Sequence, residues 1–102
     1  MENYKRVGTV NDLDDGEAKK IEIDDRKIAL FRIDGEYFAT DDTCTHEKAS
    51  LSEGEIDDET VTCPHHGAKF NIKTGQAMSL PAMFPVNTYQ IKIDGNDIMI
   101  NI

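Results

Sequence analysis

The sequence has no long hydrophobic run. Its longest aliphatic and aromatic stretch is Ile28-Ala29-Leu30-Phe31, whereas a membrane-spanning helix needs about 20 apolar residues. The first residues, Met1 to Arg6, also lack the apolar segment that is typical of a secretory signal. We therefore expect a cytoplasmic protein with no membrane partner.

Positive charge is scarce as well. The chain carries 11 lysines and arginines against 20 acidic residues, so its formal net charge is -9. Nucleic-acid binding needs clustered basic side chains to contact phosphates, and this balance argues against it. An acidic protein can be steered toward a basic docking face, but acidity also simply keeps a small protein in solution. Both interpretations remain open from charge alone.

Cysteine and histidine are rare, with 2 and 3 residues respectively. Two cysteines could form one disulfide or supply two metal ligands, and a cytoplasmic location disfavours the disulfide. The chain has 102 residues, of which 38% are hydrophobic. This is enough for one compact domain, which we expect to span residues 1–102.

Short alternating segments separated by turn residues predict antiparallel strands and an all-β fold. The run from Lys27 to Ile33 is apolar at nearly every position, which indicates a strand covered on both faces. Asp34-Gly35 predicts a tight turn after it. No long helix is supported. The expected strands are 21–23, 27–33, 36–40, 60–62, 69–72, 89–93 and 98–102, the last two forming a hairpin.

Every cysteine and histidine falls in one of two short tracts. The first is Cys44-Thr45-His46 and the second is Cys63-Pro64-His65-His66-Gly67. Each tract follows a predicted strand, so the two can form opposed loops at one end of a sheet. Such loops would bring two thiolates and two imidazoles to one point.

Two kinds of metal centre fit this ligand set. Two cysteines and two histidines can hold a structural zinc ion, which would make the chain a zinc-stapled interaction domain. Zinc fingers, however, usually keep the cysteines together and place the histidines on a helix. Here each loop supplies one of each, which favours an iron–sulfur cluster with two cysteines on one iron and two histidines on the other.

The spacing resembles the signature of the Rieske family. Cys44-x-His46 is followed by sixteen residues and then Cys63-x-x-His66, and the similarity continues through Gly67, the Thr74-Gly75 turn and Leu80-Pro81. The resemblance is strongest to the ferredoxin components of bacterial aromatic-ring-hydroxylating dioxygenases. It implies a Rieske-like antiparallel β-sandwich with a cluster-binding subdomain made of two loops, at about residues 42–85.

The resemblance also implies the ligands. Cys44 and Cys63 would hold one iron of a 2Fe-2S cluster, and His46 and His66 the other. The family ligand is the histidine directly before the glycine, so His65 would lie outside the coordination sphere. The segment from Leu80 to Pro85 would shield the cluster.

The same comparison predicts a low reduction potential. Rieske proteins that oxidise quinols carry a disulfide beside the cluster, but the matching positions here are Ala49 and His65. Those proteins also place Ser and Tyr hydroxyls near the cluster sulfurs, at positions held here by Ala68 and Phe70. With fewer hydrogen bonds to the sulfurs, the potential should lie near the bottom of the range of about -150 to +300 mV.

We expect an electron carrier rather than an enzyme. All three histidines lie in the cluster tracts, and the chain has no Gly-rich dinucleotide fingerprint. By resemblance, its partners would be an NADH-dependent flavoprotein reductase and a terminal oxygenase in aromatic hydrocarbon catabolism, and the carrier would be a monomer. The small subunit of an assimilatory nitrite reductase is the alternative within this fold.

Residues near the tracts have weaker interpretations. Asp41-Asp42 resembles a metal site, but hard carboxylates do not compete for such a cluster, so we expect turn residues. Met83 and Phe84 would cover the cluster or form an apolar docking patch. Glu47 and Lys48 would lie at a solvated loop tip or influence the choice of partner.

Overall fold

The computed structural model describes residues 4–43, 50–64, 67–78 and 85–101. Within these ranges every regular element except one short 3-10 helix is a β-strand, as the sequence predicts, and no helix is long and apolar enough to cross a membrane. The elements are β1 (Tyr4–Thr9), β2 (Glu17–Ile23), β3 (Arg26–Ile33), β4 (Glu36–Asp41), the short 3-10 helix η1 (Leu51–Glu53), β5 (Glu55–Asp57), β6 (Thr60–Thr62), β7 (Lys69–Asn71), β8 (Thr88–Tyr89), β9 (Ile91–Asp94) and β10 (Asp97–Asn101).

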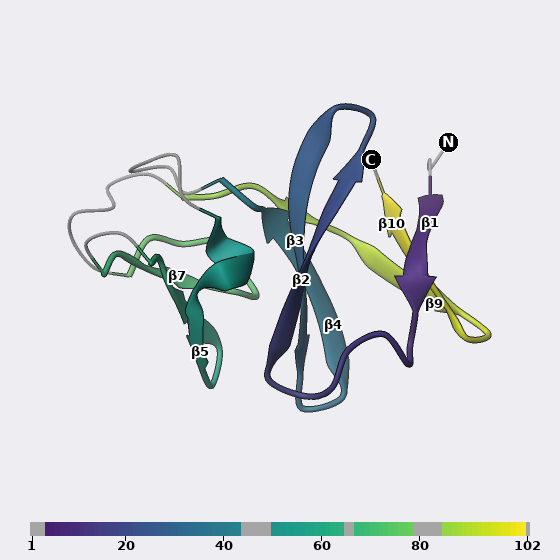
Figure 1. Cartoon of the computed structure of the whole chain (residues 1–102), viewed down its shortest axis with the longest axis horizontal. Helices are drawn as coiled ribbons and strands as arrows, with labels where there is room; N and C mark the ends of the chain where they lie inside the picture. Colours follow the sequence, from purple (N-terminus) through teal and green to yellow (C-terminus); the bar gives the residue numbers. More distant parts are fainter. Residues whose placement is uncertain (1–3, 44–49, 65–66, 79–84, 102) are drawn as a thin grey trace.

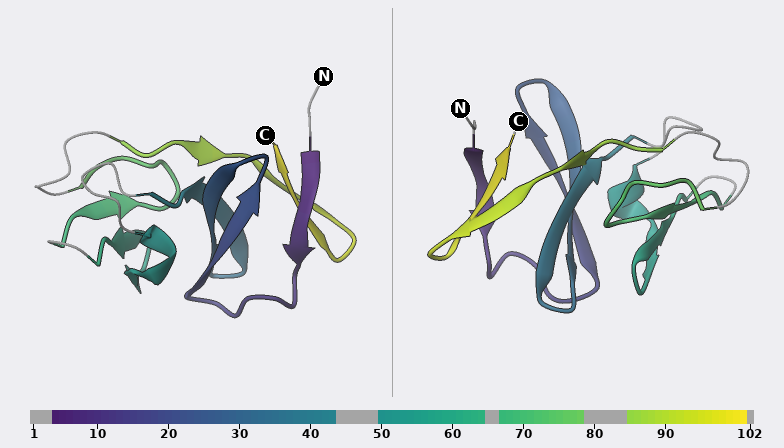
Figure 2. Two further views of the ribbon diagram at one scale, coloured as in Figure 1. Left: turned by 45° about the horizontal axis from the view of Figure 1, so that its top comes forward. Right: turned by 180° about the vertical axis from the view of Figure 1, so that it is seen from behind.

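The strands form three antiparallel sheets, which Figure 1 shows from one end of the molecule to the other. A terminal sheet has the order β1-β10-β9, and a central sheet has the order β2-β3-β4-β8. A small sheet, β5-β6-β7, lies on the opposite side of the central sheet from β1 and β10, and the two views of Figure 2 agree on this arrangement.

The central sheet separates two hydrophobic cores, because side chains alternate across its strands. Ile28 and Leu30 of β3 point into the first core, where they pack with Ile98 and Ile100 of β10. Phe31 points the other way into the second core, toward the small sheet. Residues 28–31 are therefore all buried, which confirms the prediction that this strand is covered on both faces.

Two tight turns close the hairpins of the central sheet, and the one at Asp34-Gly35 was predicted from the sequence. Asp24 and Asp25 both have positive φ, at 50° and 65°, and they join β2 to β3. Asp34 and Gly35, at 52° and 81°, join β3 to β4. Consecutive positive φ angles give a turn whose twist matches that of the flanking strands. The turn at Asp34-Gly35 therefore confirms a prediction that needed only local sequence.

The strand predicted at residues 89–93 is divided in two. The alternation of residues 89–93 predicted one strand, but Tyr89 ends β8 in the central sheet, whereas Ile91 begins β9 in the terminal sheet. Between them the carbonyl of Gln90 accepts the N–H of Asn101 at 3.0 Å. The chain crosses from one sheet to the other here, and side-chain alternation cannot reveal which neighbour a strand pairs with.

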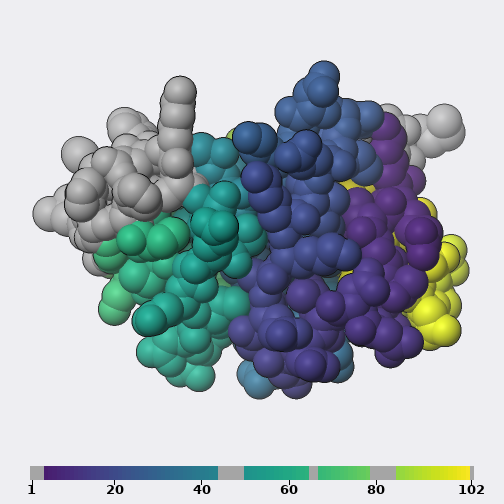
Figure 3. Space-filling view, in the orientation of Figure 1, coloured from purple at the N-terminus to yellow at the C-terminus, as the bar shows by residue number. Residues whose placement is uncertain are grey.

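The small sheet leads into the second predicted ligand tract, because Cys63 directly follows β6. Its strands pair in register through Ile56, Val61 and Phe70, and these side chains face the second core. In Figure 3 its residues form a lobe, coloured teal to green, packed against the blue residues of the central sheet. The sequence predicted β6 and β7, but it did not predict β5, η1 or the first strand β1.

Candidate metal centre

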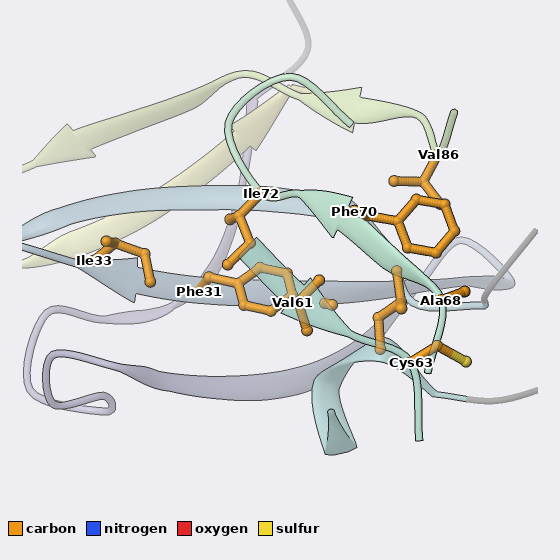
Figure 4. Packing of buried hydrophobic residues seen from close by; sticks show 10 residues of the cluster. Phe31, Ile33, Val61, Cys63, Ala68, Phe70, Ile72 and Val86 are labelled. Carbon is orange, nitrogen blue, oxygen red and sulfur yellow. The ribbon is translucent and has the colours of Figure 1, made fainter. Parts of the chain in front are cut away.

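Cys63 is the one predicted ligand that the structure describes. It follows β6, and its residue exposure is only 1%. Its backbone N–H donates to the carbonyl of Ala68 at 2.6 Å, which closes the loop of residues 63–68 at its base. Figure 4 shows Cys63 and Ala68 together at one end of the second core. Cys44, His46 and His66 lie outside the described residues, so their positions relative to Cys63 stay a prediction.

The surroundings of Cys63 are apolar on the inner side. Ala68 and Phe70 have no exposed surface and pack in the second core. Both are packing residues in this structure, and neither brings a hydroxyl to the loop. Their effect on a reduction potential stays a prediction. The second core comprises Ala29, Phe31, Ile33, Leu51, Val61, Cys63, Ala68, Phe70, Ile72 and Val86.

The outer side of Cys63 opens to a shallow groove of about 380 Å³. Its lining includes Thr62, Cys63 and Pro64, together with Glu53 and Glu55. The thiol of Cys63 therefore belongs to a residue that is buried yet close to a surface depression. A soft thiolate in such a place suits iron or zinc. The remaining lining residues are Gly54 and Gly67.

Backbone contacts close the base of segment 44–49, which contains the first cysteine tract. Thr43 and Ser50 form an isolated antiparallel bridge, which brings the two ends of segment 44–49 together. Just beyond the bridge, the N–H of Leu51 donates to the carbonyl of Asp42 at 2.7 Å. Leu51 is fully buried in the same core as Cys63. The base of the first tract is thus packed close to the element that carries the second.

The expectation that Asp41 and Asp42 are turn residues is wrong for Asp41, and it did not foresee that Asp42 is buried. Asp41 is the last residue of β4, and Asp42 lies at a bend with only 1% exposure. Asp42 is one of two buried polar residues among those the structure describes. A carboxylate is buried only where hydrogen bonds compensate its lost hydration. Nothing in the sequence distinguishes these two aspartates from the acidic turn pairs elsewhere in the chain.

Asp41 connects β4 to the chain that follows segment 79–84. Its Oδ1 accepts the hydroxyl of Tyr89 at 2.5 Å, and its Oδ2 accepts the side-chain amide of Asn87 at 3.0 Å. Partial burial of Tyr89, followed by its hydrogen bond to the Asp41 carboxylate, raises the pKa of the phenol above its ordinary value. The phenol therefore stays protonated, and the bond persists, at neutral pH.

Segment 79–84, which contains most of the predicted shielding loop and both Met83 and Phe84, also lies outside the described residues. The chain before this segment is bonded to β7, and the chain after it is bonded to the turn that follows β7. The N–H of Met78 donates to the carbonyl of Lys69 at 2.7 Å, and the N–H of Val86 donates to the carbonyl of Gly75 at 2.8 Å. Segment 79–84 is thus attached at both ends to the lobe that carries Cys63.

Comparison with known proteins gives one consistent result. The family model for the Rieske [2Fe-2S] domain matches residues 3–90. A curated relative, the 3-phenylpropionate/cinnamic acid dioxygenase ferredoxin subunit of Photorhabdus laumondii subsp. laumondii, is 51% identical over 92 residues, covering 88% of this chain and 87% of the relative.

Solved structures agree with the sequence comparison. The ferredoxin of Sphingomonas yanoikuyae B1 superposes with a TM-score of 0.92 at 35% identity, over 97% of this chain and 98% of that one. A chain of the complex between reduced oxygenase and oxidized ferredoxin in carbazole 1,9a-dioxygenase superposes with a TM-score of 0.91 at 30% identity, over 96% and 92% of the two chains.

Proposed function

This chain belongs to the Rieske 2Fe-2S family, and we propose that Cys44, His46, Cys63 and His66 hold its cluster. The donor set fits that cofactor, because thiolates suit the inner iron and imidazoles the outer one. The burial of Cys63 supports the assignment, since a thiolate that is screened from water is protected from exchange and oxidation.

The cluster supplies one-electron redox chemistry when bound. The residues of this chain would determine where it sits and how easily it accepts an electron. Cys63 would hold the inner iron at the end of β6, while His46 and His66 would hold the outer iron and lie on the route by which an electron leaves. Ala68 and Phe70 would keep the inner side dry and free of hydroxyl donors, which favours a low potential.

The function that these features support best is electron transfer within an aromatic-ring dioxygenase system. The chain would accept one electron from an NADH-dependent flavoprotein reductase and deliver it to a terminal oxygenase. The relative from Photorhabdus is named a ferredoxin subunit of such a dioxygenase, and the carbazole 1,9a-dioxygenase ferredoxin is named in complex with its oxygenase. These names favour a carrier over a catalytic component.

The proposal also covers the domain organisation of the chain. Residues 1–102 would form one domain, and residues 42–85, which include the small sheet, would be its cluster-binding subdomain. A carrier that meets two partners in turn is best kept small, so we propose a monomer. We also propose that it works in the cytoplasm, where NADH is available.

The single observation that carries this function is the place of Cys63, a buried cysteine at the base of a closed loop in a Rieske fold. The test is a reconstituted chain of NADH, flavoprotein reductase, this protein and a ring-hydroxylating oxygenase. NADH-driven product formation should require this protein and should fail with His66→Ala. Equal product without this protein would contradict the proposal.

A further inference from the structure

Asp42 is held in place by three hydrogen bonds, one to β3 and two to η1. Its N–H donates to the carbonyl of Lys27 in β3 at 3.0 Å, and its carbonyl accepts the N–H of Leu51 at 2.7 Å. Its side-chain Oδ1 accepts the N–H of Ser52 at 2.9 Å. With 1% exposure, this carboxylate has almost no contact with solvent.

Helix η1, which donates two of these bonds, is packed tightly against β6. A Cβ atom added at Gly54, directly after η1, would come within 2.2 Å of the carbonyl oxygen of Thr62. Thr62 is the last residue of β6 and precedes Cys63. Leu51 of η1 is fully buried in the same core as Cys63. The distance between η1 and the second cysteine tract is therefore fixed by backbone contact.

Asp42 lies two residues before Cys44, at the base of the first tract. A continuous set of contacts consequently runs from this base through Asp42 to η1, and from η1 through Gly54 to β6 and Cys63. Two thiolates that share one iron must be held at a constant separation although they belong to different loops. Residues that fix such loops from outside the ligand set tune how well the metal is held.

We propose that Asp42 is a positioning residue for the metal centre. Its carboxylate oxygen fixes the base of the loop that carries Cys44 and His46 against η1, and η1 sets the distance of that base from Cys63. This inference rests on the proposed ligand set. It assigns Asp42 no bond to iron and no part in proton transfer, only the acceptance of the Ser52 N–H.

The inference predicts a difference between two substitutions. Asp42→Asn keeps a side-chain oxygen that can accept the Ser52 N–H, whereas Asp42→Ala leaves that buried donor without a side-chain acceptor. A buried unpaired N–H is costly, so the loop should open more often in Asp42→Ala. The cluster should then be lost to a chelator roughly tenfold faster than in the wild type. Asp42→Asn should stay within about threefold of the wild type, because its acceptor remains.

The experiment uses the purified holoprotein. Cluster loss to excess EDTA under argon is followed by the decay of visible absorbance, and the EPR linewidths of the dithionite-reduced variants are compared. Asp12→Ala is the matched control, because Asp12 also accepts a backbone N–H, that of Thr9 at 3.0 Å, in the turn between β1 and β2. Ile100→Ala, in the first core, controls for general destabilisation.

The expected result is faster loss and broader EPR lines in Asp42→Ala alone. The inference is overturned if Asp42→Ala keeps its cluster as long as the wild type, if Asp42→Asn fails equally, or if both controls match Asp42→Ala. Should Asp42→Ala not fold, Ser52→Pro removes the same hydrogen bond from the donor side and must show the same faster loss.

Failure of the proposed function can be distinguished from failure of the positioning role of Asp42. If the wild-type protein held no cluster, the ligand proposal would fail first, and slow hydrogen exchange of the Ser52 amide would still measure its bond to Asp42. If the wild type held a cluster and Asp42→Ala behaved normally, only the positioning role would be lost.

Discussion

The hydroxyl of Tyr89 donates to Oδ1 of Asp41 at 2.5 Å, and this bond connects the end of β4 to β8. It belongs to a larger junction, because the N–H of Asp41 also donates to the carbonyl of Asn87 at 2.9 Å. β8 has only two residues that pair with β4, and the bond from Tyr89 to Asp41 adds a side-chain attachment to this short pairing. The chain leaving segment 79–84 is thereby tied to the strand that leads into the first cysteine tract.

Tyr89→Phe should lower the free energy of unfolding by about 1 kcal/mol at pH 8, because Asp41 loses a hydrogen bond at a partly buried site. The pKa of Tyr89 is raised above 10.0 in the folded protein, chiefly by burial and then by the bond to Asp41. A raised pKa gives stability that is complete below the unfolded value and is lost as pH rises toward the folded value.

The stability difference between wild type and Tyr89→Phe should therefore narrow above about pH 10. Urea unfolding followed by circular dichroism at pH 8 and pH 11 measures this difference in the free energy of unfolding. A difference that is the same at both values would show that the phenol does not titrate as its surroundings indicate.

Gly75→Ala should be among the most damaging small substitutions. Gly75 has φ of 78°, and an added Cβ would lie 2.1 Å from the carbonyl oxygen of Val86. Both the strained backbone and the backbone clash should lower the free energy of unfolding, by roughly 3 kcal/mol or more in total. The hydrogen bond from Val86 to Gly75 would be displaced with it.

Gly35→Ala is the matched control for this substitution. Its φ is 81°, but nothing lies within 4 Å of the added Cβ, so only the backbone strain of about 1 kcal/mol applies. Thermal unfolding of both variants compares them directly. Equal losses of stability in the two variants would mean that the close approach of Gly75 to Val86 does not affect the free energy of unfolding.

The two adjacent histidines should behave differently. His66→Ala should abolish the Rieske EPR signal and leave less than about a tenth of the normal iron, since it removes the proposed ligand of the outer iron. His65→Ala should keep the full signal and iron content. EPR and iron analysis of the two purified variants test the assignment, and loss of the signal in His65→Ala with retention in His66→Ala would reverse it.

Restoring the missing hydroxyls should raise the reduction potential. Ala68→Ser and Phe70→Tyr each add a donor in a place without exposed surface. If the hydroxyl reaches a cluster sulfur, it stabilises the reduced state, with an effect on the order of 50–100 mV within the Rieske range. Protein-film voltammetry measures this. Phe38→Tyr, which is only partly buried, should leave the potential unchanged, and so a rise in that variant would contradict the explanation.

Local patterns in the sequence were sufficient for much of the fold. The Asp34-Gly35 turn and the fully apolar run after Lys27 predicted the hairpin of the central sheet, and both are confirmed. Formation of this hairpin depends on residues that are close in the sequence, because both the turn and the side-chain alternation involve neighbouring residues. β1 was missed because it is held by pairing with β10 at the other end of the chain, and its sequence shows no clear alternation.

The candidate site, like the fold, could be predicted from the sequence only in part. The spacing of cysteines and histidines predicted a metal centre and its family, since ligands must be particular residue types at particular intervals. Asp42 and Gly54, which hold the loops, could not be found, because burial and close backbone approach depend on how η1 packs on β6. An aspartate that accepts a buried N–H and one in a solvated turn look identical in sequence.

The most direct test of the account is the EPR spectrum of the purified protein after dithionite reduction, taken together with its iron and zinc content. The account predicts a red-brown protein with two irons per chain that bleaches on reduction and gives a rhombic signal of low average g value. A colourless protein with one zinc per chain after expression with adequate iron, and no such signal, would contradict it.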